Sequence, residues 1–318
     1  MSPEGREGLP WPILTDADLE RDLDRTLKLV LAGVKDALLA HAEGQLVAPP
    51  RFAVDAGRGR LVFTVGVERA RTKAMGFRVY ETFPESSPEH GQIVAVFDAG
   101  DGRLLGLVLG NLLGALRTAA LNAVALEHLA RKDATTLGVL GTGFQARWHV
   151  LFALRVRPFR RVLVYSRSAE NRAAFVRWLS ARTDRPVVGR TSAEAVVREA
   201  DVLLEVTSAR TPVFDAAWLR PGVHVNTVGP KLTSGHALPL EAALQADLLF
   251  SDAPAQLAAY EEYSLPQASR ARVVPLSALV AGRHPGRRTP DERTLFLSAG
   301  LAGTEPAAAW RLFSVRRA

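Results

Sequence analysis

Residues 136–146 read Thr136-Leu137-Gly138-Val139-Leu140-Gly141-Thr142-Gly143-Phe144-Gln145-Ala146, and a helical pattern follows them through Ala153. An apolar run therefore leads into a turn of the form G-x-G-x-x-A. Gly141 permits the tight turn, Gly143 lets the backbone approach a ligand, and Ala146 allows the helix to pack closely on the sheet. Backbone amides at the start of the helix then face an anionic group. These features predict a dinucleotide site formed by Gly141, Thr142, Gly143, Phe144, Gln145 and Ala146.

The pattern after Asp133 is typical of a doubly wound parallel sheet. Short apolar runs (TLGVL, RVLVYS, DVLLEV, VHVNTVG and DLLFSD) alternate there with helical patterns at intervals of about 20 to 30 residues. Upstream, helical spacing covers residues 15–42 and 115–130, and short strands with hairpin turns are expected between residues 51 and 110. Residues 289–318 are expected to return as a helix. The sequence thus predicts an α/β protein with a smaller domain beside a Rossmann-type domain.

The composition is that of an ordinary globular protein. The chain has 318 residues, of which 47% are hydrophobic and 23% charged, and it has no cysteine. These values exclude disordered and fibrous classes, and they exclude disulfide frameworks and catalytic thiols. No run is apolar for long enough to cross a membrane, and the first twenty residues lack the apolar core of a signal peptide. We therefore expect a cytoplasmic protein that does not associate with membranes.

The positive net charge does not point to a nucleic-acid partner. The formal charge is +7, but the arginines are scattered along the chain, and only five of the 40 basic residues are lysines. Net charge alone describes solubility rather than partners. The seven histidines show no i, i+4 pair and no H-x-H pattern, so no metal site is expected.

The residues at the end of the second predicted strand indicate whether the dinucleotide is NAD or NADP. An NAD site has an acid there for the ribose 2′-hydroxyl, whereas an NADP site has an arginine for the 2′-phosphate. The sequence is Ser166-Arg167-Ser168, with no acid until Glu170 and with Arg172 one turn later. Arg167 is suited to bind a phosphate, and the two serines can donate hydrogen bonds to it. We expect NADPH or NADP, with NAD as the less favoured alternative.

Several motifs together resemble the ornithine cyclodeaminase/mu-crystallin family. They are Arg117-Thr118-Ala119-Ala120, the turn Gly141-Thr142-Gly143-Phe144-Gln145-Ala146, and Thr294-Leu295-Phe296-Leu297-Ser298-Ala299-Gly300. Pro50-Arg51, Val225-Asn226-Thr227-Val228-Gly229 and Gly282-Arg283-His284-Pro285-Gly286-Arg287 fit the same pattern. The resemblance spans nearly the whole chain.

The resemblance implies a domain arrangement and a class of chemistry. Residues 1–116 with 293–318 would form a substrate-binding and dimerisation domain, and residues 117–292 the dinucleotide domain of a homodimer. The chemistry would be hydride transfer to or from the nicotinamide at an imine of an amino acid. The implied substrate-binding residues are Arg51 and Arg117, whose guanidinium groups would hold a carboxylate, together with Thr118. Arg51 or Arg117 could instead belong to a structural ion pair.

The chain departs from the family at two catalytic positions. The family's lysine falls on Arg78, which stays protonated and is a poor proton shuttle, and Lys73 is an alternative for that role. The family acid that follows Gly229 falls on Lys231, and a family glutamate falls on Ala237. Lys231 or His236 could donate a proton if its pKa were close to neutrality, although a solvated loop residue is the simpler interpretation of both.

The leading hypothesis is an NADPH-dependent reductase of imines or ketimines. The alternatives are an ornithine or lysine cyclodeaminase that releases ammonia and recycles NAD in place, and a non-catalytic NADPH-binding protein with a degenerate site. Ligands usually meet the carboxyl ends of parallel strands. Further cofactor contacts are therefore expected at Thr207, Ser208, Val228 and Gly229.

Overall fold

The structure, a computed structural model, describes residues 9–84, 91–260 and 262–314, and it divides into two compact units. The first unit is built from the chain up to Ala120 and from Gly300 onward, and the second is Leu121–Ala299. Both boundaries lie a few residues beyond the expected ones at 116/117 and 292/293. Helix α3 (Leu112–Leu129) starts in the first unit and ends in the second.

A seven-stranded sheet organises the described part of the first unit. Its order is β1-β7-β6-β5-β4-β2, with β3 paired to β4, and every pair except β1 with β7 is antiparallel. The hairpins expected between residues 51 and 110 are therefore confirmed. The strands are β1 (Ile13–Thr15), β2 (Leu46–Val47), β3 (Phe52–Asp55), β4 (Arg60–Glu68), β5 (Ala74–Glu81), β6 (Ile93–Asp98) and β7 (Leu104–Leu109).

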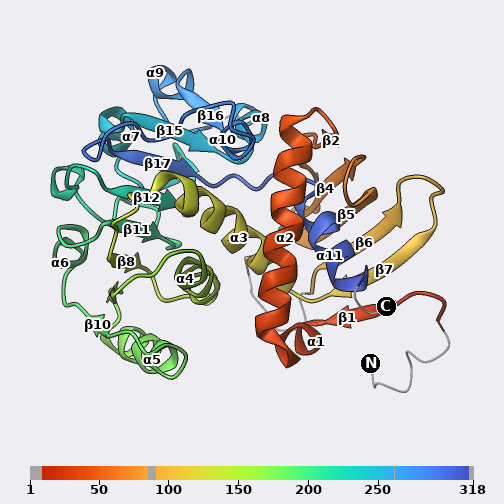
Figure 1. Ribbon diagram of the computed structural model, residues 1–318, viewed down its shortest axis with the longest axis horizontal. Helices are drawn as coiled ribbons and strands as arrows, with labels where there is room; N and C mark the ends of the chain where they lie inside the picture. The colour runs from red at the N-terminus through yellow and green to blue at the C-terminus, as the bar shows by residue number, and fades with distance from the viewer. Residues whose placement is uncertain (1–8, 85–90, 261, 315–318) are drawn as a thin grey trace. The chain divides into compact units, whose positions relative to one another are not determined.

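Side chains alternate across this sheet. On β4, Val62 and Thr64 are buried, whereas Leu61 and Val65 are exposed on the other face. Helices α2 (Leu23–Ala42) and α11 (Thr304–Ser314) lie side by side, and α11 packs on the buried face (Figure 1). The approach is close, because a methyl group added at Gly66 would lie 2.4 Å from the Cα atom of Gly303. This contact brings the first turn of α11 onto the inner face of the sheet.

Two helix predictions need correction. The helix expected over residues 15–42 is preceded by β1 and is broken into α1 (Asp16–Arg21) and α2. Asp22 interrupts it, because this residue leaves the helical conformation and its side chain accepts a hydrogen bond from the backbone N–H of Arg25. The helix expected over residues 289–318 is confirmed for α11, and residues 315–318 lie outside the described residues. It is wrong for β17 (Thr294–Leu297), which pairs with β12 and β15 in the second unit. A strand buried on both faces is continuously apolar, and that pattern is easily mistaken for a helix.

An eight-stranded parallel sheet organises the second unit. Its order is β10-β9-β8-β11-β12-β17-β15-β16. The chain reverses its winding direction between β8 and β11, which is where doubly wound sheets bind dinucleotides. The strands are β8 (Thr136–Leu140), β9 (Arg161–Tyr165), β10 (Val187–Gly189), β11 (Val202–Glu205), β12 (His224–Thr227), β15 (Leu248–Ser251), β16 (Val273–Pro275) and β17.

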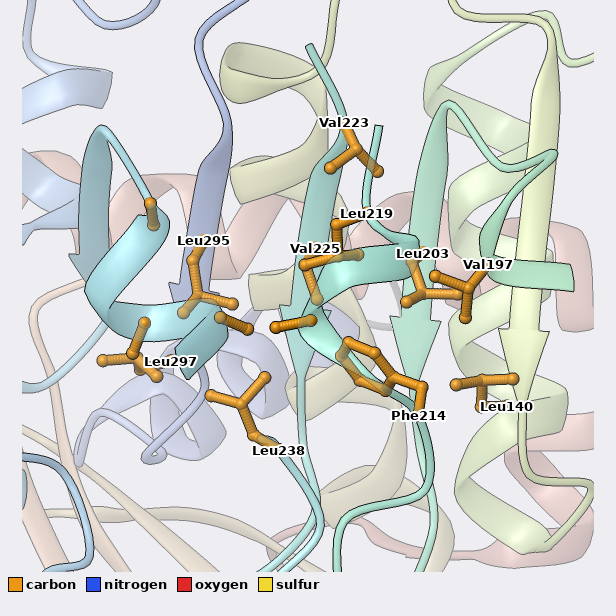
Figure 2. Packing of buried hydrophobic residues seen from close by; sticks show 14 of the residues in the cluster. Leu140, Val197, Leu203, Phe214, Leu219, Val223, Val225, Leu238, Leu295 and Leu297 are labelled. Carbon is orange, nitrogen blue, oxygen red and sulfur yellow. The ribbon is translucent and has the colours of Figure 1, made fainter. Parts of the chain in front are cut away.

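Helices cover both faces of this sheet. One core joins Val139 and Leu204 to α4 (Phe144–Val156) and α5 (Ala169–Ser180). The opposite core contains Leu203, Val225 and Leu295, which lie on neighbouring strands and project to the same side (Figure 2). The shorter helices are α6 (Ala193–Val197), α7 (Leu240–Gln245), α8 (Pro254–Ala258), α9 (Gln267–Arg270) and α10 (Leu276–Val280).

No helix in the described ranges has the length and apolar character needed to span a bilayer.

Candidate functional site

Three arginines and one glutamate gather in the first unit. Strand β5 places Arg78 on the inner face of the sheet, α3 supplies Arg117, and Arg51 directly precedes β3. Glu305, in the first turn of α11, is fully buried, and its Oε1 lies 2.9 Å from Nε of Arg117 and 3.2 Å from Nη1 of Arg78. Sequence reasoning missed Glu305, although an acid at the start of the apolar run Pro306–Ala309 is a visible signal.

The two guanidinium charges stabilise the carboxylate of Glu305 but repel each other. Burial would raise the pKa of Glu305, but the positive charges of Arg117 and Arg78 outweigh it and hold that pKa below its ordinary value. Burial lowers the pKa of Arg78, and the charge of Arg117 lowers it further, whereas Glu305 opposes both effects. The carboxylate therefore stays ionised between two guanidinium groups.

Arg51 and Arg117 converge next to Gly300. A methyl group added there would lie 2.9 Å from Nη1 of Arg117 and 3.1 Å from Nη2 of Arg51. Nη1 of Arg117 is buried and has no hydrogen-bond partner among the described residues. Buried donors are normally satisfied, so this N–H points to a missing acceptor. Two guanidinium groups thus come together beside Gly300, and a side chain at this position would displace them.

Arg78 is held on several sides. Its Nε donates to Oε1 of Gln92 over 2.6 Å, its Nη1 donates to Glu305, and its guanidinium lies 4.2 Å from the centre of the Tyr80 ring. The Tyr80 hydroxyl in turn accepts from Nη1 of Arg51 over 3.2 Å. Lys73, the alternative to Arg78, is exposed in the turn before β5 and has a positive φ of 48°. Five residues of strand separate the two, which is about 16 Å.

Thr118 is also engaged within its own helix. Its hydroxyl donates to the carbonyl oxygen of Gly114 over 2.8 Å. The hydroxyl oxygen of Thr118 can still accept a hydrogen bond, so the expected role of Thr118 at the substrate stays a prediction.

The glycine-rich turn has the geometry that its sequence predicts. Gly141 has a φ of +107°, and a methyl group there would lie 2.1 Å from the carbonyl oxygen of Val206. A methyl group on Gly143, the N-cap of α4, would meet nothing within 4 Å. Ala146 is fully buried in the core beneath the helix, whereas Phe144 is half exposed. The backbone of this turn is therefore open to a ligand on the side where Gly143 lies.

The predicted phosphate-binding residues divide into two roles. Arg172 donates from Nη1 to the carbonyl oxygen of Ser166 over 2.7 Å, and Ser168 caps α5 by accepting from the N–H of Asn171 over 3.1 Å. These two residues shape the loop. Arg167 is exposed and makes no side-chain hydrogen bond within the described ranges. Its guanidinium is available to an anionic group beside the start of α5.

A second buried acid lies at the carboxyl ends of β11 and β12. Glu205 is fully buried, accepts from the hydroxyl of Thr227 over 2.6 Å and accepts from the N–H of Thr207 over 3.3 Å. Burial raises its pKa, against the hydrogen bond from Thr227 and the positive charge of Lys231. A methyl group at Gly229 would lie 2.6 Å from Oε1 of Glu205. Sequence reasoning placed Thr207 and Gly229 here but missed Glu205, an acid inside an apolar strand.

The neighbouring cofactor positions are less enclosed. Ser208 is exposed, and Val228 donates its N–H to the carbonyl oxygen of Glu205. The expected contacts of Ser208 and Val228 with the cofactor stay predictions.

Lys231 is buried, so the solvated-loop interpretation is wrong for this residue. It lies on β13 (Lys231–Leu232), which pairs with β14 (Gly235–His236), and its Nζ donates to the carbonyl oxygen of Gly229 over 2.9 Å. His236 is half-buried, and its Nδ1 lies 2.8 Å from the carbonyl oxygen of Leu238. Sequence periodicity cannot detect the burial of Lys231, because the two strands of this hairpin have only two residues each.

Within the described ranges, no group of three or more acidic or histidine side chains could hold a metal ion. One of the seven histidines, His90, lies outside those ranges.

Known proteins resemble this chain in sequence and in structure. The profile of the ornithine cyclodeaminase/mu-crystallin family matches residues 13–315. A Delta(1)-pyrroline-2-carboxylate reductase of Bacillus cereus is 34% identical over 242 residues, which cover 72% of this chain and 74% of that protein. Rat ketimine reductase mu-crystallin is 29% identical, with 94% and 95% covered. The structure of Thermococcus litoralis Delta(1)-pyrroline-2-carboxylate reductase in complex with NADH and L-proline superposes with a TM-score of 0.87 at 26% identity, with 96% and 98% covered.

Proposed function

Since the chain belongs to the ornithine cyclodeaminase/mu-crystallin family, we infer that it is an NAD(P)H-dependent oxidoreductase that reduces an imine or ketimine of an amino acid. The observation that carries the substrate side of this proposal is the approach of two guanidinium groups to Gly300. Arg117 and Arg51 flank it, and the buried Nη1 of Arg117 lacks an acceptor. A carboxylate supplies the acceptor oxygens and the negative charge that two guanidinium groups require.

The proposed roles follow from the chemistry of each side chain. When bound, the reduced nicotinamide supplies the hydride. Arg51 and Arg117 hold the substrate carboxylate and thereby fix the direction in which the C=N bond points. Arg78, rather than the exposed Lys73, is the better candidate for the position of the family lysine, where it supports the site without exchanging a proton. Reduction of C=N also consumes one proton, and Lys231 is the proposed donor, with His236 as the alternative.

NADPH is the proposed cofactor, because Arg167 stands at the end of β9 where an NAD site would carry an acid. The unengaged guanidinium of Arg167 can bind a 2′-phosphate. The Ser168 hydroxyl accepts from Asn171 and can still donate its proton to that phosphate. We also propose a cytoplasmic location, because the chain has no cysteine.

A homodimer is proposed from the outer face of the first unit's sheet. Phe52, Val54, Leu61, Val65 and Ile93 are all exposed on β3, β4 and β6. Contiguous exposed apolar side chains of this kind mark interfaces. Val54→Asp is expected to give monomers in analytical ultracentrifugation. Leu244→Asp, at a separately exposed apolar residue of the second unit, is the matched control and should leave the dimer intact. A monomeric wild type would contradict the proposal.

The test of function is the oxidation of NADPH, followed by absorbance, with pyrroline- and piperideine-carboxylates as substrates. Consumption of NADPH only when an imine is present supports the reductase. Release of ammonia from ornithine or lysine without net NADPH consumption would favour a cyclodeaminase instead. Tight binding of NADPH without turnover of any imine would favour a non-catalytic binding protein.

A further inference from the structure

We propose that Tyr80 is a positioning residue that fixes the orientation of the Arg51 guanidinium for the substrate carboxylate. This inference rests on the proposed function, in which Arg51 and Arg117 hold that carboxylate. It adds a role for a tyrosine that acts through Arg51, and sequence reasoning missed this residue.

Arg51 stands at the edge of the first unit's sheet. It directly precedes β3, which pairs only with β4 among the described strands and whose four residues are all exposed. The ring of Phe52 stacks on that of Phe63 at 5.1 Å, so the start of β3 is anchored on the outer face. A long arginine side chain at such an edge samples many orientations unless a partner holds it. The orientation of the guanidinium therefore depends on what it meets on the inner face.

Tyr80 reaches Arg51 across the intervening strand. On β5, Tyr80 lies two residues after Arg78 and therefore shares the inner face of the sheet with it. Strand β4 lies between β5 and β3, and its residue Val62 is paired with Tyr80. The Tyr80 hydroxyl accepts from Nη1 of Arg51 over 3.2 Å, although the two residues are 29 positions apart in the chain. One hydrogen bond thus joins two strands that are not neighbours.

The ring of Tyr80 is itself held in place. The Arg78 guanidinium lies 4.2 Å from the ring centre, where the negative face of the ring attracts a cation. Arg78 in turn donates to Gln92 over 2.6 Å and pairs with the fully buried Glu305. A hydroxyl on a ring that is held in this way is a fixed acceptor, so it defines where Nη1 of Arg51 lies.

The other arm of the Arg51 guanidinium is the one that approaches Arg117. Nη2 is the atom of Arg51 closest to Gly300, and Nη1 of Arg117 approaches the same residue. Because a guanidinium is planar, a fixed hydrogen bond at Nη1 restricts the directions of its remaining N–H groups. An arginine that is ordered before the substrate arrives loses less entropy on binding. Tyr80 should therefore strengthen substrate binding and leave the hydride-transfer step unchanged.

The test is Tyr80→Phe, which keeps the ring against Arg78 and removes only the hydroxyl. We expect KM for pyrroline-2-carboxylate to rise about three- to tenfold, the effect of ordering one long side chain on binding. Both kcat and the NADPH dissociation constant should stay within about twofold, because uniform binding alone is lost. Tyr263→Phe is the matched control, because it removes a buried phenolic hydroxyl that has no hydrogen-bond partner within the described ranges. Its KM should equal that of the wild type.

A double-mutant cycle with Arg51→Ala shows whether Tyr80 acts through Arg51. Arg51→Ala alone should raise KM by more than Tyr80→Phe does, because it removes the guanidinium itself. Adding Tyr80→Phe to Arg51→Ala should change KM by less than about twofold, since no guanidinium is left to position.

Three results would overturn the proposal. The first is a Tyr80→Phe protein with the KM of the wild type. The second is an effect of Tyr80→Phe that is equally large with and without Arg51, which would mean that the tyrosine acts on the substrate directly or on the fold. The third is a fall in kcat at constant KM. A wild type that reduces no imine contradicts the proposed function instead, so the two failures are distinct.

Discussion

Gly300→Ala tests the carboxylate position most directly, because its effect can be worked out from two distances. The new methyl group would lie 2.9 Å from Nη1 of Arg117 and 3.1 Å from Nη2 of Arg51, so it would displace the guanidinium groups that we expect to pair with the substrate carboxylate. Substrate would lose at least one charge-assisted hydrogen bond, worth about 1.5–3 kcal/mol. That loss corresponds to a rise in KM of about 10- to 100-fold.

The same substitution also has a backbone cost that must be separated from this effect. Gly300 has a φ of +89°, and alanine in that region costs about 1–2 kcal/mol of folding stability. Gly102→Ala is the matched control, because Gly102 has a φ of +75° and a methyl group there would meet nothing within 4 Å. Both variants should lose similar stability in urea unfolding. Only Gly300→Ala should raise KM.

The assay combines steady-state reduction of pyrroline-2-carboxylate with fluorescence titration of NADPH. We expect the NADPH dissociation constant to be unchanged in both variants, since neither glycine belongs to the glycine-rich turn or to the loop of Arg167, which we propose to bind NADPH. A Gly300→Ala protein that is folded and has the KM of the wild type would contradict the placement of the carboxylate. A rise in KM that Gly102→Ala shares would attribute the effect to backbone strain.

Three further predictions concern the second unit. Arg167→Ala should weaken NADPH binding by about tenfold, because one charge-assisted contact is lost. NADH binding should be unchanged in the same titration, and equal effects on both cofactors would exclude a 2′-phosphate contact. Lys231→Met should lower kcat by about 100-fold or more and remove one limb of the pH–rate profile, whereas an unchanged profile would exclude Lys231 as the donor. Burial lowers the pKa of His149 to about 4 from 6.5, so the stability it contributes is fully present above pH 6.5 and is lost as the pH falls toward 4. His149→Phe should therefore flatten the fall in unfolding free energy below pH 6.5 by up to about 1.4 kcal/mol per pH unit, measured by urea unfolding; an unchanged slope would show that His149 does not titrate in this way.

The sequence determined the parts of this protein that depend on local geometry. The turn at Gly141 and Gly143 follows from backbone conformations that only glycine adopts easily, and the alternation of apolar runs with helical patterns predicts a parallel sheet. Arg167 could be placed at the end of β9 because the loop between β9 and α5 is short and its position follows from that of the strand. Within residues 51–110, short runs rich in Val, Phe and Leu, separated by turn residues, were enough to predict the hairpins.

Only the tertiary structure decided how residues distant in the sequence meet. Glu305 and Arg117 are far apart in the chain, and no periodicity predicts that α11 packs against the strand that carries Arg78. Lys231 reads as a solvated loop residue, and only the structure shows that the β13–β14 hairpin carries it in a buried position. The strand β17 looks like part of a helix, because an interior strand buried on both faces has no alternation to reveal it. Burial and charge pairing are properties of the packed chain, so the pairing of Glu305 with Arg117 and Arg78 could be found only once the fold had brought them together.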